Sequence, residues 1–246
     1  APGIEVTPSD ELNFGEIPRG TDRTSSVSIT NTGTTTLDIT DISVSGTDSG
    51  SFVPGQTTET IEPGESELVA VTFKDATSFT DATLDITSNA GTTSVALNAT
   101  ILNPNLAKSS YTRDFTQVPV GSTTTRTITV ENTGAADLNV DLTNAFDQTP
   151  FSLRTSKDTL TVPADESRFL TVQFSPTQDG DADATAVLPT NDPDTDLTIT
   201  ASGTGTVTDL GADQSTLTFS TGWDGTETQT VVISNDGQQD IESLDT

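Results

Sequence analysis

Acidic side chains at alternating positions are the residues whose types and spacing come closest to a binding site. The segment DGDADA places Asp179, Asp181 and Asp183 two residues apart, as in the opening of a calcium-binding loop. The rest of that pattern is missing, because Ala184 stands where the turn needs glycine and Thr190 where a bidentate glutamate should close the site. We therefore predict no metal site, and the three aspartates are the weak candidate that remains for calcium.

A second acidic segment, NDPDTD at 191–196, follows the sequence ATAVLP at 184–189, which has the composition of a β-strand. At about 3.3 Å per residue this strand would hold the two acidic segments roughly 20 Å apart, too far for one coordination sphere. We therefore expect two acidic turns on a charged surface, and not the two halves of one ion site.

Catalytic chemistry has few side chains to draw on. The chain contains no His and no Cys, so it lacks imidazole bases, thiolate nucleophiles and the usual ligands of zinc. Two carboxylates about 5 to 10 Å apart could still act as a glycosidase pair, but the carboxylates fall in predicted loops and at outward strand positions. No phosphate-binding loop, nucleophile elbow or dinucleotide-binding glycine motif occurs. We predict that the chain is not an enzyme and binds no cofactor.

Two single residues are candidates for modification or contact. Asn98 begins NAT, the only N-x-S/T sequence with no proline in the middle, and would face outward from a strand whose Val95 and Leu97 face the core. It is the candidate glycosylation site of an exported chain. Trp223, the only tryptophan, lies in a predicted turn, where we expect it to pack at a domain junction as an interface residue.

The elements that must position these residues are short β-strands. Apolar residues alternate with polar ones in runs such as Val27 and Ile29 or Leu84 and Ile86, and Gly, Asn, Asp and Pro separate the runs. No stretch has a helical stripe. The pattern predicts an all-β fold of antiparallel immunoglobulin-like β-sandwiches. Without the Cys and Trp of antibody domains, the core must be held by aliphatic residues and by Phe14, Phe52 and Phe73 in the first copy.

A phrase containing asparagine and glycine returns about every hundred residues. It reads ITNTG at 29–33, VENTG at 130–134 and ISNDG at 233–237. IEPGES at 61–66 matches VPADES at 162–167 in the same register, and ITSN at 86–89 matches LPTN at 188–191. We expect the asparagine to bond the local backbone and the glycine to take positive φ, so that each phrase is a turn.

This register predicts two complete sandwiches, residues 1–102 and 103–205, followed at 206–246 by the N-terminal half of a third. The linkers at 102–105 and 203–207 are too short to act as flexible tethers, so we expect an extended rod with limited bending.

The order of these motifs resembles the Hydin-type repeats called ASH domains, relatives of the major sperm protein sandwich. The resemblance is carried by LNFGEIPRG, VSITNTGTTTLDI and IEPGES in the first copy and by DFTQVPVG, ITVENTGAADLNV and TNDPDTDLTITASGTG in the second. It implies a scaffold: in prokaryotes such repeats belong to secreted, surface-anchored multidomain proteins, and the family offers no catalytic residues to transfer.

The third copy cannot close a sandwich with about 40 residues, and it would expose strand edges and an apolar face. The gene could continue beyond this chain, another subunit could donate the missing strands, or the segment could cap the second domain. We prefer the first explanation. The second predicts protein partners, either other surface proteins or further copies of this chain, that bind by strand complementation.

The net charge limits partners and environment. Nine Lys and Arg face 37 Asp and Glu, a formal charge of −28, which repels phosphate backbones and anionic lipid. We expect no nucleic-acid partner. Scarce lysine with abundant Asp and Thr is typical of salt-loving organisms, and with the resemblance it suggests a haloarchaeal protein. The chain begins APG and contains no Met, as expected for a mature exported product, and no apolar run is long enough for membrane insertion in this segment.

Taken together, these patterns predict a non-catalytic extracellular structural protein. We expect a tandem immunoglobulin-like scaffold in a surface filament, appendage or cell-wall protein of a halophile. The alternatives are a module of an adhesin or viral receptor-binding fibre and, less favoured, an accessory region of a secreted enzyme.

Overall fold

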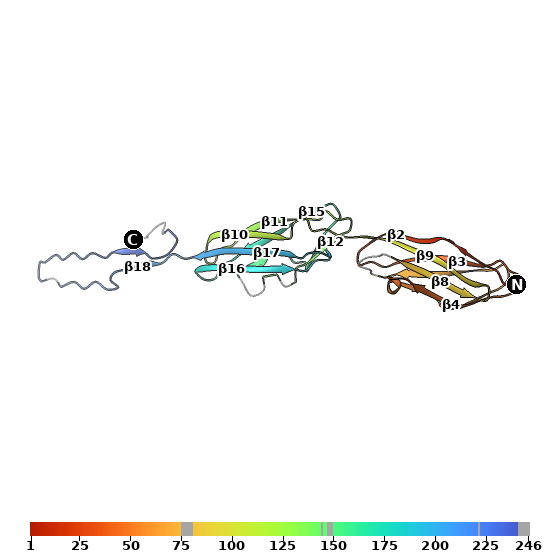
Figure 1. Cartoon of the computed structure of the whole chain (residues 1–246). Helices are drawn as coiled ribbons and strands as arrows, with labels where there is room; N and C mark the ends of the chain where they lie inside the picture. Colours follow the sequence, from red (N-terminus) through yellow and green to blue (C-terminus); the bar gives the residue numbers. More distant parts are fainter. Residues whose placement is uncertain (75–80, 144, 147–149, 221, 241–246) are drawn as a thin grey trace.

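The computed structural model of the chain describes residues 1–74, 81–143, 145–146, 150–220 and 222–240. Its regular elements are β-strands and one 3₁₀ turn, Ser49–Ser51, and these residues contain no α-helix. The predicted all-β, immunoglobulin-like class is therefore confirmed. Figure 1 shows three successive parts in chain order: the first domain (β1 to β9), the second domain (β10 to β17) and the third segment, which contains β18 and β19.

The first domain is a sandwich of two sheets with the strand orders β1-β3-β7-β5 and β2-β9-β8-β4-β6. The first sheet contains β1 (Ile4–Thr7), β3 (Arg23–Asn31), β7 (Ser66–Phe73) and β5 (Phe52–Pro54). The second sheet contains β2 (Glu11–Pro18), β9 (Gly91–Leu102), β8 (Ala82–Ser88), β4 (Leu37–Ser45) and β6 (Glu59–Ile61).

The second domain repeats this plan in smaller sheets, with the orders β10-β17-β16, β11-β15-β13 and β12-β14. One sheet contains β10 (Ser110–Pro119), β17 (Leu197–Thr206) and β16 (Gly180–Leu188). The facing strands are β11 (Thr124–Glu131), β15 (Ser167–Phe174) and β13 (Phe151–Leu153), and the short pair is β12 (Leu138–Asp141) with β14 (Thr159–Val162).

Two strand pairs differ from the antiparallel arrangement that the sequence predicts. β2 pairs with β9 in parallel, and β10 pairs with β17 in parallel. The cause is topological: β2 is followed by β3 in the opposite sheet, so no hairpin joins it to β9 and the chain direction is not constrained to reverse.

Each domain has its own apolar core between its sheets. In the first, the ring centroid of Phe52 lies 5.3 Å from that of Phe14 and 5.0 Å from that of Phe73. In the second, Phe115, Phe151 and Phe174 form the corresponding cluster. The two sets of buried residues form separate clusters, and full burial of one such side chain contributes about 1.5 to 3 kcal/mol.

The third segment has little regular structure. β18 (Leu210–Ala212) and β19 (Ile233–Asn235) pair over three residues, and the chain between them is an extended loop (Figure 1). Phe219, at the repeat position of the buried Phe14 and Phe115, is 54% exposed. Because its large apolar side chains are exposed, the described part of the segment does not pack as a cap on the second domain. Residues 241–246, the end of the predicted half-domain, lie outside the described residues, and the boundaries at 102 and 205 stay predictions.

Candidate functional site

The most elaborate repeated polar structure surrounds the asparagine of each recurring phrase. We call residues 31–35, 132–136 and 235–239 the asparagine turns. Asn31 and Asn132 are both 0% exposed. Asn31 Nδ2 donates to the carbonyls of Thr35 and Ile61, both at 2.9 Å, and its Oδ1 accepts the Gly33 N–H at 2.9 Å. One side chain thereby joins the end of β3, the following turn and β6.

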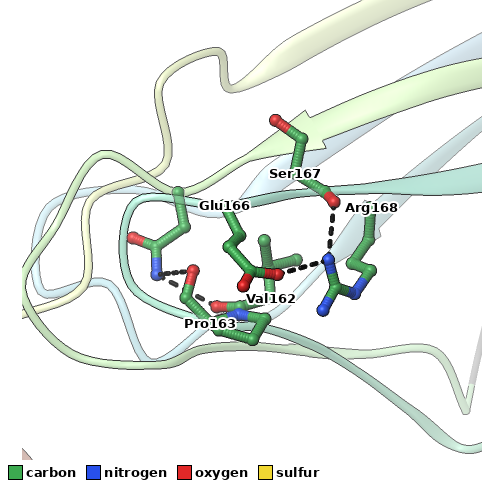
Figure 2. A network of polar contacts seen from close by, with 6 residues as sticks. Val162, Pro163, Glu166, Ser167 and Arg168 are labelled. Carbon is green, nitrogen blue, oxygen red and sulfur yellow. Dashed lines mark hydrogen bonds and ion pairs between the residues drawn. The ribbon is translucent and has the colours of Figure 1, made fainter.

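The second domain repeats this arrangement. Asn132 Nδ2 donates to the carbonyl oxygens of Ala136 at 2.8 Å, Val162 at 3.0 Å and Pro163 at 3.1 Å. Figure 2 shows the last two acceptors together with the turn that they begin. An ion pair of 2.6 Å between Glu166 and Arg168 flanks that turn, but both side chains are about half exposed, so it adds only about 0 to 1 kcal/mol.

The glycine of the phrase has a different role from the predicted one. Gly33, Gly134 and Gly237 are not among the glycines with positive φ, so that prediction is wrong. Instead, the backbone of a preceding segment crosses directly over each of them. A Cβ on Gly33 would lie 2.4 Å from the Ala1 carbonyl oxygen, and one on Gly134 would lie 2.3 Å from the Asn105 nitrogen. Glycine is needed here because the two backbones approach too closely for any side chain.

The crossing segments are the residues that enter each repeat, and we call 1–3, 103–105 and 207–209 the leading segments. Each is hydrogen-bonded to the asparagine turn of its own repeat. The backbone N–H groups of Thr133 and Ala135 donate to the carbonyls of Asn105 and Asn103, both at 2.9 Å. The equivalent bonds run from Thr32 to Gly3 and Thr34 to Ala1, and from Asp236 to Asp209 and Gln238 to Val207.

The residue just before each of the last two leading segments is hydrogen-bonded to the preceding domain. The Arg19 N–H donates to the Leu102 carbonyl at 2.9 Å, and the Val120 N–H donates in the same way to Thr206. Side chains reinforce both places: Arg19 Nη1 lies 3.4 Å from Asn103 Oδ1, and Gln239 Nε2 donates to the hydroxyl of the buried Thr206 at 2.7 Å. The chain between consecutive repeats is therefore bonded from both directions and is not a free tether.

A shallow cavity of about 370 Å³ lies at the first junction. It is lined by residues of both domains: Pro18, Arg19 and Thr21, then Ala135, Ala136, Asp137, Asn139 and Asn191.

The third asparagine turn is built locally but is incomplete. Asn235 makes the same two short-range bonds, from Nδ2 to the Gln239 carbonyl at 2.7 Å and from the Gly237 N–H to Oδ1 at 3.2 Å. It is exposed, whereas Asn31 and Asn132 are buried. Among the described residues, no carbonyl takes the place that Ile61 and Val162 occupy beside the other two asparagines.

The predicted calcium candidates do not form a site. β16 begins at Gly180, so Asp181 and Asp183 lie within a strand and not in the predicted acidic turn. Asp179 precedes that strand, and Asp181 Oδ1 accepts a 2.6 Å hydrogen bond from the Thr204 hydroxyl. Across the part of the chain that the structure describes, no three acidic side chains gather where they could hold a metal ion.

Two residues that sequence reasoning gave no role are structural. Asp192, buried within the second acidic segment, accepts the Leu106 N–H at 2.6 Å and so fixes the entry of the second domain. Asn191 accepts the Asn139 N–H at 2.7 Å and donates to the Asp137 carbonyl at 3.0 Å. In the first domain, Asn89 makes the equivalent bonds to Asp38 and Thr36. The repetition of this asparagine, in ITSN at 86–89 and in LPTN at 188–191, could have predicted its structural role.

The remaining candidates lie at the surface. Asn98 lies on the outer side of β9, half-buried, and its Nδ2 donates to Glu11 Oε1 at 3.2 Å. Trp223 is 99% exposed in a turn closed by the Gly225 N–H and the Gly222 carbonyl. It does not pack at a domain junction within the described residues, contrary to our expectation, and its role as an interface residue stays a prediction.

Shifted pKa values mark structural positions. Hydrogen bonds from the hydroxyl and the backbone N–H of Thr143 lower the pKa of Asp141, which holds a turn at the end of β12. Burial raises the pKa of Tyr111, whose hydroxyl donates to the Thr129 carbonyl. Both groups are held by hydrogen bonds that fix local structure, Asp141 in its turn and Tyr111 against β11.

The fold and the asparagine turns together define a tandem immunoglobulin-like β-sandwich protein whose repeats are joined through hydrogen-bonded segments. Residues 100–195 match the family model ASH, described as abnormal spindle-like microcephaly-associated, ASPM-SPD-2-Hydin. Residues 5–101 match DUF1573, a protein of unknown function. The ASH match agrees with the resemblance of the motifs over residues 100–195, which contain most of the second domain. No curated protein matches the chain.

Solved structures with similar folds share little sequence with this chain. A protein of unknown function from Porphyromonas gingivalis W83 is 15% identical, with a TM-score of 0.34, covering 82% of this chain and 99% of its own. The ASH/PapD-like domain 7 of human CEP192 is 15% identical, with a TM-score of 0.32, covering 42% of this chain and 84% of its own. The periplasmic chaperone SfaE is 11% identical, with a TM-score of 0.32, covering 82% of this chain and 100% of its own. The described residues include no helix of the length and apolar character needed to cross a membrane.

Proposed function

We propose that this chain is a non-catalytic structural protein, in which immunoglobulin-like domains are held end to end as a spacer in a surface filament, appendage or cell-wall protein. The observation that carries the proposal is the double attachment of the linkers. Leu102, the last residue of β9, is bonded to Arg19 of the first domain, and the residues that follow it, Asn103 and Asn105, are bonded by the asparagine turn of the second domain. Such a junction resists bending better than a free linker does and transmits force along the chain.

We place this scaffold outside the cell, in a concentrated salt solution. The formal charge of −28 supports the concentrated salt, because a dense carboxylate surface repels itself in dilute buffer and is screened in salt. Ion pairing does little to relieve the repulsion, since the ion pairs found among the described residues join Lys74 to Asp22 and Arg168 to Glu166, all partly exposed. A protein without His or Cys serves such a scaffold well and offers little for catalysis.

We further propose that its partners are proteins, either other surface proteins or further copies of the chain, which complete the third segment with strands of their own. Exposed apolar side chains at Phe219, Val232 and Ile233 support this, as does the open side of the Asn235 amide. An adhesin is the second candidate, and the fully exposed Trp223 in a projecting loop is the observation that favours it.

A distance measurement across the first junction tests the scaffold. The chain has no cysteine, so Glu67→Cys and Arg168→Cys introduce a unique pair of spin labels at equivalent exposed positions of the two domains. In molar potassium chloride we expect one narrow distance distribution. A control with a Gly/Ser stretch inserted between Leu102 and Asn103 should broaden it. Equally broad distributions for both proteins would contradict a stiff junction.

Electron microscopy in high salt separates the two candidates. Ordered polymers of the purified protein support the structural role, whereas monomers that bind cells support the adhesin.

A further inference from the structure

The charge of the chain reverses locally in one stretch of the second domain. Residues 103–130 contain three basic residues, Lys108, Arg113 and Arg126, and a single acidic one, Asp114. Over the whole chain, 37 acidic residues face nine basic ones. The stretch includes β10 and β11, which side-chain hydrogen bonds join at one edge of the sandwich. We call the three basic residues the basic cluster.

The edge of β11 lacks a strand that the first domain has. There, β1 pairs with the corresponding strand β3 over Ile4–Thr7. In the second domain, the equivalent chain makes only an isolated bridge, between Leu106 and Asn132, before β10 begins. Apart from that bridge, no strand of the described chain pairs with β11 on the side away from β15.

This edge lies wholly within the described residues, since the structure describes every residue from 103 to 131. The sheet order β11-β15-β13 places β13, which directly follows residues 147–149 in the chain, at the opposite edge of the sheet. The surroundings of β11 can therefore be assessed from side chains whose positions are known.

Side chains of β10 take the place of the missing strand, and they bind only carbonyl oxygens. The Tyr111 hydroxyl donates to the Thr129 carbonyl, and Arg113 Nε and Nη2 donate to the Thr127 carbonyl at 3.2 and 3.1 Å. Because the N–H and C=O of a strand residue point to the same side, the N–H groups of Thr127 and Thr129 also face this edge. Neither N–H has an acceptor in the described part of the chain. The edge therefore offers mainly hydrogen-bond donors.

Aromatic rings hold the cations of the basic cluster. Lys108 Nζ lies 4.7 Å from the centroid of the Tyr111 ring, and the guanidinium carbon of Arg113 lies 5.6 Å from the same centroid. The guanidinium carbon of Arg126 lies 5.8 Å from the centroid of the Phe115 ring. A cation over a ring keeps most of its N–H groups available for other acceptors. Lys108 Nζ and the two Nη atoms of Arg126 bond no acceptor among the residues that the structure describes.

The basic cluster has no carboxylate partner within the described chain, because none of the ion pairs found there involves it. β10 and β11 carry one carboxylate each. Asp114 Oδ1 accepts the Thr116 N–H at 2.8 Å, and Glu131 is the last residue of β11. Three neighbouring cations without a counter-ion, in a chain with a formal charge of −28, favour a carboxylate ligand that another molecule supplies.

We propose that the basic cluster and the β11 edge bind an extended acidic segment of a partner protein. Carboxylates at every second residue of such a segment lie about 7 Å apart, which is also the spacing between Thr127 and Thr129. They accept hydrogen bonds from the basic cluster and from the two free N–H groups of β11. The partner does not add as a strand, because Tyr111 and Arg113 occupy the carbonyls that an added strand would need.

This site belongs to the second domain alone. In the register of the repeats, Leu12 stands at the position of Arg113 and Ser25 at that of Arg126. In the first domain β1 also covers the corresponding edge of β3. The inference therefore goes beyond the proposed scaffold, because it gives one domain a ligand that the other cannot bind.

The test uses the whole chain in molar potassium chloride, where a Debye length of about 3 Å leaves mainly contact interactions. The probe is a synthetic peptide in which Asp alternates with Thr, and the control is a peptide of the same composition whose Asp residues are consecutive. We expect the alternating peptide to bind about threefold or more tightly than the control. At saturation it should slow hydrogen exchange in β11 by about tenfold, with no change in β3.

Two matched variants locate the site. Lys108→Gln/Arg126→Gln should weaken binding of the alternating peptide by about three- to tenfold. Arg154→Gln/Lys157→Gln removes the same two kinds of charge from exposed positions between β13 and β14, so it should leave the affinity unchanged. Thermal unfolding of both variants confirms that an altered affinity does not come from loss of the fold, because all four side chains are exposed.

Three results would overturn the proposal. Equal affinities of the alternating and consecutive peptides would remove the argument from spacing. Equal effects of the two variants would show that the peptide responds only to net charge. Exchange in β11 that slows as the protein concentration rises, without peptide, would identify the occupant as a second copy of the chain and not as a separate partner.

Discussion

At the scale of single residues, Asn31 and Asn132 show how one amide can define a repeat. Each side chain donates hydrogen bonds to carbonyls of two different segments and so fixes the asparagine turn. That turn is hydrogen-bonded to the leading segment. Buried polar groups are costly when unpaired, so these positions tolerate little change. The asparagine is therefore the residue that brings strand, turn and linker together.

Replacing Asn132 with alanine should destabilise the second domain by about 3 kcal/mol, because it leaves buried carbonyl and N–H groups without partners at about 1 to 3 kcal/mol each. Calorimetry or denaturant unfolding in high salt measures the change. Asn235→Ala is the matched control: this asparagine is exposed, and the unfolding of the two domains should not change. Similar losses in both variants would contradict our account of the buried amide.

The glycine of the phrase permits a second prediction. Gly134→Ala forces a Cβ against the backbone of 103–105 and should cost about 1 to 3 kcal/mol through overpacking. Hydrogen exchange at Thr133 and Ala135, whose N–H groups bond the leading segment, should speed up. Gly50→Ala is the control, since nothing lies within 4 Å of its Cβ position and its φ is not positive. Unchanged exchange in Gly134→Ala would show that the crossing is loose.

The sequence predicted these residues better than it predicted their roles. Repetition identified the asparagine and glycine, but the glycine's role depends on a segment about thirty residues earlier, which no local turn rule includes. Asp192 was read as surface charge because its partner, the Leu106 N–H, is distant in the sequence. The sequence could predict local turn-forming residues, but it could not predict which distant segments approach each other closely.

At the scale of elements, alternation predicted the strands because one face of each is buried. Val27 and Ile29 in β3 and Leu84 and Ile86 in β8 are all buried, as expected. Alternation does not specify neighbours, so it could not show that β2 and β9 run parallel. It also could not predict that β12 ends at Asp141, whose carboxylate accepts a hydrogen bond from the Thr143 N–H and turns the chain.

The third segment should be the first part of the molecule that a protease cuts. Chymotrypsin should cleave after Phe219 or Trp223 while both domains remain intact, because the described residues between β18 and β19 have few backbone bonds to break. Phe169 is the internal control: it is 75% exposed but lies in the paired strand β15, so it should resist. Mass spectrometry of the first fragments decides the matter. Initial cleavage at Phe169 would contradict the predicted order of stability.

At the scale of the whole molecule, charge governs stability. With 37 acidic against nine basic residues, self-repulsion opposes folding and weakens as the Debye length shrinks to about 3 Å at 1 M salt. We therefore predict that the melting temperature, followed by circular dichroism, falls as potassium chloride is removed. A sucrose series at constant low ionic strength separates charge screening from solute exclusion. Equal stability at low and high salt would contradict the prediction.

The hydrogen-bonded leading segments decide where one repeat can be exchanged for another. A recombination event that joined two genes just before the first strand, for example at Leu106, would separate a domain from the three residues that lie across its own turn. A crossover before residue 103 or 207 keeps each leading segment with the asparagine turn that binds it. A repeat unit that includes its own joint therefore starts in the apparent linker, at residue 103 or 207, and not at its first strand.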